Sequence, residues 1–512
     1  MSQKRIGTII LLFCWQHLLI ITTTHNTMRH LLFLLTASLV AWLTPGCQNA
    51  SQSTAEAPVS FPNIVLIMAD DLGYGDLGGY GQETIQTPYL DRMATEGMRF
   101  TQHYAGNTVC APSRCALMTG YHMGHAEIRG NTQADPYGQA PLSDTALTVA
   151  EVLQGAGYRT ALIGKWGLGV EGSSGDPLRQ GFDTYYGYLD QVLAHNYYPE
   201  YLLRNGEREM LANEVQYLDS TAWHRGLGSR STKKVDYSHD LFTQEALKFI
   251  EQTDDQPFFL YLPYTIPHNN GEALPGETME VPDAGSYATE DWPQETQNYA
   301  AMITRMDRDV GQLLDQLRAS GLDSSTLVIF TSDNGPMPDE DFTNFFDSNG
   351  PLRGGKRDMY EGGIRVPFIA RWPGTIQPNT QNDHISAFWD FLPTAAELAG
   401  APVPTTDGIS YLPALRGDAQ PPHDYLYWEF PEKGYRVGLR RGQWKAVRNN
   451  MEEDPNGPIE LYNLAQDPGE ENNVADQHPE VAKELTRLMK EAHVPSEQFP
   501  MPGEPVATTM NQ

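Results

Sequence analysis

Hydrophobic and polar positions follow two alternating patterns along most of the chain. Continuous apolar runs predict buried strands at residues 63–68, 160–163, 258–263 and 326–330. Elsewhere apolar positions recur at helical spacing, which predicts helices over residues 87–97, 148–153, 240–252 and 297–320. Because helices alternate with apolar strands, we expect an α/β fold with a mixed, mostly parallel central sheet sandwiched between helices.

The pattern changes beyond residue 420. Partly alternating apolar positions predict antiparallel strands at residues 435–447 and 459–462, and a last helix is predicted over residues 479–492. We therefore expect a main domain over residues 61–420, which carries the chemistry. A small C-terminal α+β subdomain with an antiparallel sheet is expected to pack on it, over residues 421–512.

The N-terminus has the pattern of an export signal. It contains two apolar runs, at residues 6–21 and 31–43, separated by Met28-Arg29-His30. A basic residue before the second run is typical of a signal peptide, so we expect a leader over residues 1–47 with its natural start at Met28. The alternative is a membrane anchor, but both runs are shorter than the ~20 apolar residues that a spanning helix needs.

The end of the leader leaves two modes of export open. Gly46-Cys47 indicates a lipoprotein cleavage site with lipid attached to Cys47, but Thr44 stands where a leucine is usual. The Ser-, Ala- and Gln-rich residues 48–60 are predicted to form a flexible tether. We therefore expect a periplasmic, cell-surface or extracellular protein, either free or lipid-anchored.

Charge and cysteine content narrow the classes of partner and of fold. The chain has 512 residues, 65 of them acidic and 35 basic, and a formal net charge of −30. This charge disfavours nucleic acid as a partner, and it disfavours membrane contact other than through a lipid anchor. Of the four cysteines, Cys14 and Cys47 lie in the predicted leader, which leaves Cys110 and Cys115. Two cysteines exclude a disulfide framework, even in an oxidising compartment.

Chemistry-bearing side chains follow each of the four predicted strands. Asp70-Asp71 and Lys165 come directly after their strands, while His268 and Asp333-Asn334 follow theirs closely. In open α/β sheets, ligands bind beyond the carboxyl ends of the strands. We therefore expect these side chains to meet at one edge of the sheet.

The residue types at this edge favour a hard metal ion. Asp70, Asp71, Asp333 and Asn334 offer oxygen donors without an accompanying cluster of histidines or cysteines. Oxygen-only ligation suits calcium or magnesium rather than zinc. Each segment on its own also fits a turn or a helix cap. The prediction therefore depends on the segments coming together.

One motif connects this edge to a known family. Cys110-Ala111-Pro112-Ser113-Arg114, followed by Thr119-Gly120, resembles the signature of the type I sulfatases. The resemblance implies the alkaline phosphatase/sulfatase-like fold. It also implies that a separate formylglycine-generating enzyme converts Cys110 to formylglycine (3-oxoalanine). One hydroxyl of the aldehyde hydrate would attack sulfur, and the second would let the aldehyde re-form and expel sulfate.

The resemblance extends to the predicted metal site and its basic residues. Asp-Asp-Leu-Gly at residues 70–73 and Ser-Asp-Asn-Gly at residues 332–335 are similar to sulfatase segments. They imply one calcium ion per chain, and the implied ligands are Asp70, Asp71, Cys110, Asp333 and Asn334. By the same resemblance Arg114 steadies the hydrate, Lys165 and Lys356 contact the sulfate group, and His268 protonates the leaving oxygen with help from Lys356.

The chain departs from the family at one position. Many sulfatases have Lys-Trp-His-Leu-Gly, whereas Gly167 stands here in place of the histidine that assists collapse of the hydrate. We expect another imidazole to reach the same volume. His125 and His195 are the candidates, with His122 as a weaker third.

The expected activity is that of an arylsulfatase-like sulfuric ester hydrolase that acts on a sulfated small molecule, most simply a sulfated carbohydrate. Trp166, Tyr185, Tyr186, Tyr197 and Tyr198 are either a platform for a sugar or ordinary packing residues. Two alternatives remain: a phosphate or phosphonate monoester hydrolase on the same fold, and a catalytically inactive exported glycan-binding protein. The second alternative predicts an unmodified thiol at Cys110.

Overall fold

The computed structural model describes residues 61–134, 137–218, 228–338 and 340–504. The predictions for the leader, the tether, Met28 and Cys47 lie outside these residues. All described residues belong to one compact unit, Ser60–Gln512.

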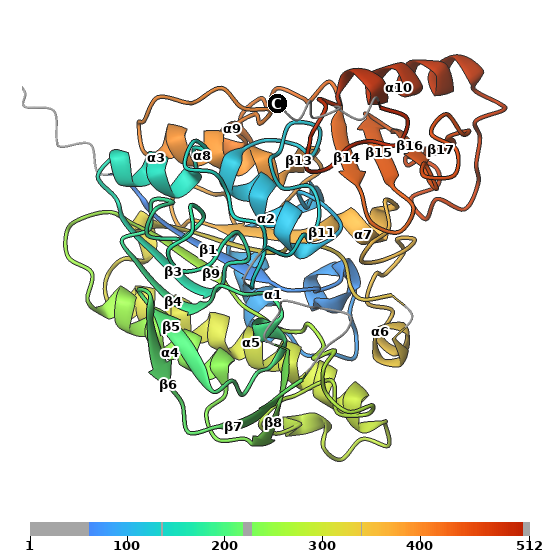
Figure 1. Cartoon of the computed structure of the whole chain (residues 1–512). Coiled ribbons are helices and arrows are strands. Elements are labelled where there is room, and N and C mark those ends of the chain that lie inside the picture. The colour runs from blue at the N-terminus through green and yellow to red at the C-terminus, as the bar shows by residue number, and fades with distance from the viewer. Residues whose placement is uncertain (1–60, 135–136, 219–227, 339, 505–512) are drawn as a thin grey trace, which may run out of the picture. The chain divides into compact units, whose positions relative to one another are not determined.

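A large twisted sheet runs through this unit (Figure 1). Within the described residues it has eleven strands in the order β12-β2-β11-β10-β1-β9-β3-β4-β5-β6, with β13 paired to β2. The strands β10, β1, β9, β3 and β4 run parallel, and β11 and β5 join them antiparallel on either side. The expected mixed, mostly parallel sheet is confirmed. The bounds are β1 Asn63–Ala69, β2 Met98–Tyr104, β3 Arg159–Lys165, β4 Thr184–Tyr188, β5 Tyr201–Arg204, β6 Glu207–Met210, β9 Phe258–Pro263, β10 Thr326–Ser332, β11 Arg365–Arg371, β12 Thr380–Asn382 and β13 Ser386–Ala387.

Strand β1 is buried along its whole length, which explains its apolar sequence NIVLIMA. It pairs with β10 on one side and with β9 on the other, so both of its edges are satisfied. Each fully buried Ile, Leu or Val side chain stabilises the fold by roughly 1.5–3 kcal/mol. A continuous apolar run is therefore what a central parallel strand requires.

Helices cover both faces of the sheet. In Figure 1 helices α2, α3 and α8 lie above the sheet and α4 and α5 lie below it, where α5 also contacts α1. The bounds are α1 Pro88–Glu96, α2 Cys110–Thr119, α3 Val149–Gly155, α4 Ser238–Glu251, α5 Gln294–Ala319, α6 Asp341–Phe346, α7 Glu361–Ile364, α8 Phe391–Leu398, α9 Leu412–Arg416 and α10 Pro479–Glu491. Short 3-10 turns are η1 Tyr74–Asp76, η2 Gly78–Tyr80, η3 Leu193–His195, η4 Gly285–Tyr287, η5 Asp323–Ser325 and η6 Phe388–Asp390.

The start of α1 is held differently from what its sequence suggests. Thr87 stands at the N-cap position, but its hydroxyl accepts a hydrogen bond from the Gly78 amide instead. The carboxylate of Asp307, on α5, accepts from the amides of Leu90 and Tyr89 at 2.7 and 3.2 Å. A distant acid thus satisfies the helix N-terminus and links α1 to α5.

The C-terminal region forms its own antiparallel sheet, β14-β15-β16-β17, beside α10 (Figure 1). Its apolar residues make a second core, which includes Leu439 and Leu461 of the sheet and Leu485 of α10. Trp428 and Phe430 of β14 belong to the main core instead, so β14 packs against the main body. The bounds are β14 Leu426–Phe430, β15 Arg436–Arg441, β16 Trp444–Arg448 and β17 Glu460–Asn463, and a separate hairpin pairs β7 Glu214–Tyr217 with β8 Ser229–Lys233.

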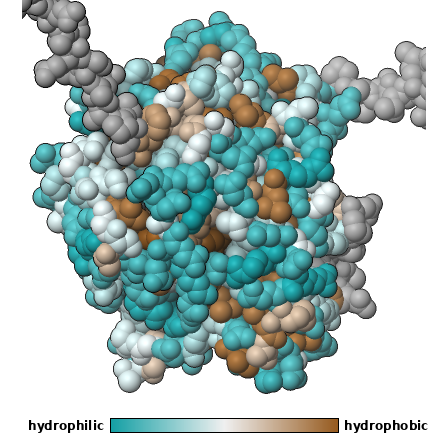
Figure 2. Space-filling model, turned by 90° about the vertical axis from the view of Figure 1, so that its left-hand side faces the viewer, coloured by the Kyte–Doolittle hydropathy of each residue, from teal (hydrophilic) through white to brown (hydrophobic). Residues whose placement is uncertain are grey.

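The surface agrees with the strongly acidic composition. Figure 2 shows that one face is mainly hydrophilic, with hydrophobic side chains in small separate groups. Among the residues that the structure describes, no helix has the length and apolar character needed to span a bilayer.

Candidate active site

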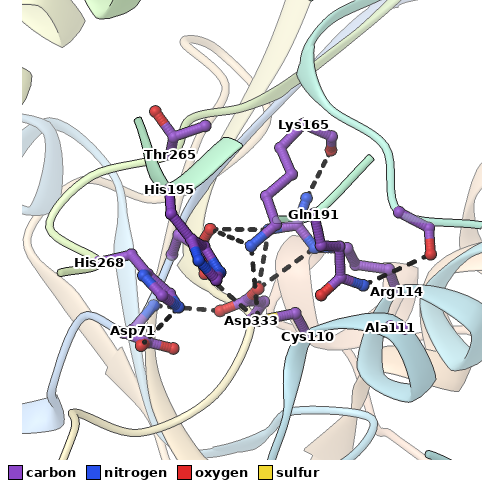
Figure 3. Close-up of polar contacts among 12 residues, drawn as sticks. Asp71, Cys110, Ala111, Arg114, Lys165, Gln191, His195, Thr265, His268 and Asp333 are labelled. Carbon is purple, nitrogen blue, oxygen red and sulfur yellow. Dashed lines mark hydrogen bonds and ion pairs between the residues drawn. The ribbon is translucent and has the colours of Figure 1, made fainter. Parts of the chain in front are cut away.

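The strand registers bring the predicted site residues to one edge of the sheet. Ala69 at the end of β1 is opposite Ser332 at the end of β10, so Asp70 and Asp333 emerge side by side. Met68 is likewise opposite Pro263 of β9, which precedes the loop to His268. Figure 3 shows side chains from these strand ends converging with Cys110. The expected meeting of the strand ends is therefore observed.

Cys110 is the first residue of α2 and is 2% exposed. Its Sγ lies 3.5 Å from Oδ1 of Asp70. The ammonium groups of Lys165 and Lys356 lie 3.6 and 3.7 Å from the same sulfur atom. A helix N-terminus presents free backbone N–H groups and a positive dipole end, which favours an anion beside Cys110.

The thiol itself is poorly suited to act as a nucleophile. Burial and the nearby Asp70 carboxylate raise the pKa of Cys110 to about 12, against the opposing effect of the two lysines. The thiolate, and not the thiol, is the nucleophilic form of cysteine. The surroundings of Cys110 therefore favour an uncharged group at this position.

Arg114 lies one helical turn after Cys110 and is completely buried. Its guanidinium donates to Oδ2 of Asp333 from Nη2 at 2.7 Å and from Nε at 3.2 Å, and Nη1 donates to the Lys165 carbonyl at 2.5 Å. These bonds join α2 to the ends of β10 and β3. Because the pair is buried, removing one partner costs about 3–5 kcal/mol.

Each of the two adjacent aspartates contacts one lysine. Oδ2 of Asp70 lies 2.6 Å from Nζ of Lys165, and Oδ2 of Asp71 lies 2.7 Å from Nζ of Lys356. Asp71 has a φ of 62°, a left-handed conformation that a short polar residue tolerates. This turn lets consecutive aspartates reach different sides of the same site.

The pKa values of the carboxyl groups follow from these contacts. Burial opposes ionisation of Asp70 and Asp71, but the surrounding cations outweigh it and lower both pKa values. Burial and the Asp70 charge raise the pKa of Asp333 to about 6, although Arg114 opposes the shift. At neutral pH the carboxylates therefore balance the charges of Arg114, Lys165 and Lys356.

The residues present fit a hard divalent cation. Ligand atoms of Asp70, Asp71, Cys110 and His268 all lie within 4.8 Å of one another. Asn334 donates from Nδ2 to Asp71 at 2.7 Å, while its Oδ1 is buried and has no hydrogen-bond partner among the described residues. A buried carbonyl oxygen without a donor is costly unless something binds it. Beside carboxylates, such an oxygen suits calcium.

His268 forms a hydrogen bond at each ring nitrogen. Nδ1 lies 2.6 Å from the carbonyl oxygen of Asn269, so Nδ1 carries the proton in the assigned tautomer. Nε2 then accepts from the ammonium of Lys356, 3.0 Å away. Burial and the Lys356 charge hold the pKa of His268 well below its usual value. The imidazole is therefore neutral and linked to a protonated lysine.

The structure distinguishes between the two histidines, His125 and His195, that are candidates to replace the family histidine missing at Gly167. The ring of His195 stacks on His268 with 4.7 Å between centroids, so His195 belongs to the site. His125 instead pairs with Asp407 at 2.9 Å and lines a pocket of about 280 Å³ with Thr119, at the opposite end of α2 from Cys110. His125 is close to the Cys110 motif in the sequence but distant from it in the structure, because α2 begins at the site and ends near His125.

His122 also lies at that distant end, stacked on His125 with 4.4 Å between ring centroids. Its Nδ1 accepts from the Gly124 amide, which leaves Nε2 to carry the proton toward Asp407. The weaker third candidate is thus engaged elsewhere. Of the two interpretations of the aromatic residues, ordinary packing is observed. All five are at most 5% exposed and belong to the main core: Trp166, Tyr185, Tyr186, Tyr197 and Tyr198.

Gln191 is a site residue that the sequence analysis missed. A Cβ added to Gly167 would lie 2.7 Å from Nε2 of Gln191, so the glutamine occupies the space of a side chain at position 167. Gln191 follows β4, another parallel strand that ends at the same edge, and Figure 3 shows it beside Arg114 and Lys165. The rule that ligands bind beyond strand ends could have placed Gln191 at this edge of the sheet, but not in the space beside Gly167.

Comparisons with known proteins agree with this geometry. A family model described as Sulfatase matches residues 62–401, and one described as N-sulphoglucosamine sulphohydrolase, C-terminal, matches residues 354–495. The chain belongs to the sulfatase family. This sulfatase is 36% identical to human arylsulfatase A over 471 residues, which cover 83% of this chain and 87% of that protein.

Two further relatives are similar over most of their length. An N-acetylgalactosamine-6-O-sulfatase of Bacteroides thetaiotaomicron is 30% identical, with 88% of this chain and 96% of that protein covered. A crystal structure of Ps i-CgsB in complex with k-i-k-neocarrahexaose superposes with a TM-score of 0.70 at 28% identity, covering 88% of this chain and 96% of that one. The protein is a sulfuric ester hydrolase with the fold of the sulfatases.

Proposed function

We propose that this sulfatase removes sulfate from a sulfated carbohydrate, with formylglycine at position 110 and one calcium ion beside it. The observation that carries the proposal is the surroundings of Cys110: a helix N-terminus, two ammonium groups and a carboxylate meet at its sulfur atom. Such a pocket is complementary to an anion held against an uncharged nucleophile.

The modified residue would supply the nucleophile. The hydrate of formylglycine carries two hydroxyl groups, one to attack sulfur and one whose deprotonation releases sulfate from the enzyme. Cys110 starts a rigid, fully buried helix, so a hydroxyl there is held in a fixed direction. Arg114 maintains that direction by tying α2 to Asp333 and to the end of β3.

Calcium would be held by Asp70, Asp71, Asp333 and Asn334, and when bound it would supply Lewis acidity to the site. The charge balance supports a divalent ion at this place. Without it, the carboxylates and the cations of the site cancel. With it, the site gains two positive charges and attracts an anionic sulfate ester.

The leaving oxygen needs a proton, and the pair formed by Lys356 and His268 holds a proton that it can donate. Nζ of Lys356 donates to Nε2 of His268 over 3.0 Å, while Asp71 accepts from the same ammonium. A proton shared along this contact is available to the oxygen of a departing alcohol. Lys165, held at Asp70, is left to neutralise a sulfuryl oxygen.

The carbohydrate substrate is inferred from relatives. The names of two of them refer to N-acetylgalactosamine 6-O-sulfate and to a neocarrahexaose, both saccharides. We also propose that the chain is exported, either free or lipid-anchored, which agrees with hydrolysis of sulfated polysaccharides outside the cell. The partner required during maturation is the formylglycine-generating enzyme.

Measuring sulfate release over a panel of defined sulfated saccharides tests the proposal. The enzyme should release sulfate from at least one saccharide and act at least about 100-fold more slowly on the matching phosphate ester, because a sulfatase stabilises the transition state of sulfuryl transfer rather than that of phosphoryl transfer. A faster reaction with the phosphate ester would favour the phosphatase alternative. Saccharide binding without release of sulfate would favour the inactive glycan-binding protein.

A further inference from the structure

A second histidine lies against the one that contacts Lys356. The rings of His195 and His268 are 4.7 Å apart and nearly parallel, at 14° (Figure 3). Nδ1 of His195 lies 2.9 Å from Oε2 of Glu272. Because an ionised carboxylate only accepts hydrogen bonds, Nδ1 of His195 carries the proton and its ring plane is fixed by Glu272.

The segment that carries His195 is itself held in place. It is the last residue of η3, and Leu193 in that turn donates from its amide to Asp190 at 2.6 Å. The next residue, Asn196, is fully buried; its carbonyl accepts from Tyr188 at 2.7 Å and its side chain donates to Ser229 of β8 at 2.9 Å. His195 is therefore presented by a rigid turn.

Glu272 is equally constrained. Its side chain is 6% exposed, and its amide donates to Oδ1 of the buried Asn270 at 3.1 Å. The backbone of Gly228 packs closely against the Glu272 side chain, because a Cβ atom added to Gly228 would lie 3.0 Å from Cγ of Glu272. The carboxylate thus has little freedom except to hold His195.

The other contacts of His268 act on its backbone and, within the plane of the ring, on its two nitrogens. Tyr197 donates to the His268 carbonyl, Asn269 accepts from Nδ1, and Lys356 donates to Nε2. Those bonds leave the ring faces to packing. A parallel aromatic ring at this separation restrains rotation of the His268 ring out of its plane.

We propose that Glu272 and His195 form a positioning pair that keeps the His268 ring aligned with the leaving oxygen. The inference rests on the proposed function and deepens it: His195 acts through His268, so it is a positioning residue. It supports protonation of the leaving group, a task different from that of the family histidine replaced by Gly167. The space that the family histidine would fill at position 167 is occupied by Gln191 instead.

The role predicts an effect that depends on the leaving group. A sugar alcohol leaves poorly without a proton, whereas 4-nitrophenolate leaves easily without one. His195→Ala should therefore lower kcat for the best sugar sulfate of the panel by about 30-fold, with KM changed less than about threefold. For 4-nitrophenyl sulfate kcat should fall less than about threefold. His195→Phe, which keeps a stacked ring, should retain at least about a third of kcat for the sugar sulfate.

Matched variants separate positioning from general damage. His125→Ala removes a histidine with a similar carboxylate partner and ring stack, far from Cys110, and should leave kcat unchanged for both substrates. Glu272→Leu should resemble His195→Ala, whereas Glu272→Gln, whose carbonyl still accepts from Nδ1, should stay close to wild type. Thermal melts identify any variant that fails to fold. The variants that do fold then show whether His195 and Glu272 position the His268 ring.

The outcomes distinguish this inference from the proposed function. A wild-type enzyme that releases sulfate from neither substrate overturns the proposed function, and the inference with it. An active wild type in which His195→Ala slows both substrates equally, or neither, overturns the inference alone. The inference alone is also overturned if His195→Phe is as slow as His195→Ala on the sugar sulfate.

Discussion

Replacement of Cys110 by alanine is expected to lower turnover of a sulfate ester at least about 1,000-fold, because it removes the atom from which the nucleophile is made. Cys110→Ser should react once at most. A serine hydroxyl can take the sulfuryl group, but it has no second hydroxyl with which to expel it. Ion chromatography of released sulfate, combined with the mass of the protein after reaction, measures both results.

Cys115→Ala is the matched control. Cys115 lies on the same helix, is also buried and free, and packs in the main core. Its replacement should lower the free energy of unfolding by about 1 kcal/mol and leave turnover nearly unchanged. Equal loss of activity in both variants would mean that Cys110 has no special role.

Removal of divalent ions is expected to have the second-largest effect. A chelator should reduce turnover at least about 100-fold, and added calcium should restore it. The melting temperature should also rise with calcium, because an ion that binds only the folded state stabilises it. The physical reason is the Oδ1 atom of Asn334, which has no hydrogen-bond partner among the described residues, while Nδ2 of the same side chain donates to the Asp71 carboxylate.

Two variants give this test its controls. Asn334→Leu keeps the volume but removes the unpaired oxygen, so the rise in melting temperature with calcium should shrink. Asp407→Asn alters the other described cluster with metal-ligand side chains, which includes His122 and His125, and should leave that rise unchanged. Full turnover and an unchanged melting temperature after chelation would contradict a metal site at Asp70 and Asp71.

The central sheet and the edge that carries the site could be predicted because they depend on local patterns. A buried parallel strand must be apolar throughout, so β1 and β10 are visible in the sequence. The residues after them must then meet, which is why Asp70 and Asp333 could be named as partners. The family resemblance added Lys356, which follows no predicted strand.

The remaining features depend on contacts between distant segments. His125 and His195 are equivalent in the sequence, and only the direction of α2 and the stacking on His268 separate them. Asp307 replaces Thr87 as the cap of α1 because α5 passes beside that helix end. The filling of the Gly167 space by Gln191 likewise requires the fold of the loop after β4. No spacing rule carries this information.

The most direct test of the central claim is the mass of the peptide that contains residue 110, taken from enzyme matured in its own cell and trapped with an aldehyde reagent. The account predicts that most copies carry an aldehyde in place of the thiol and form the adduct. A peptide that carries only the unmodified cysteine, from a preparation that still releases sulfate, would contradict it.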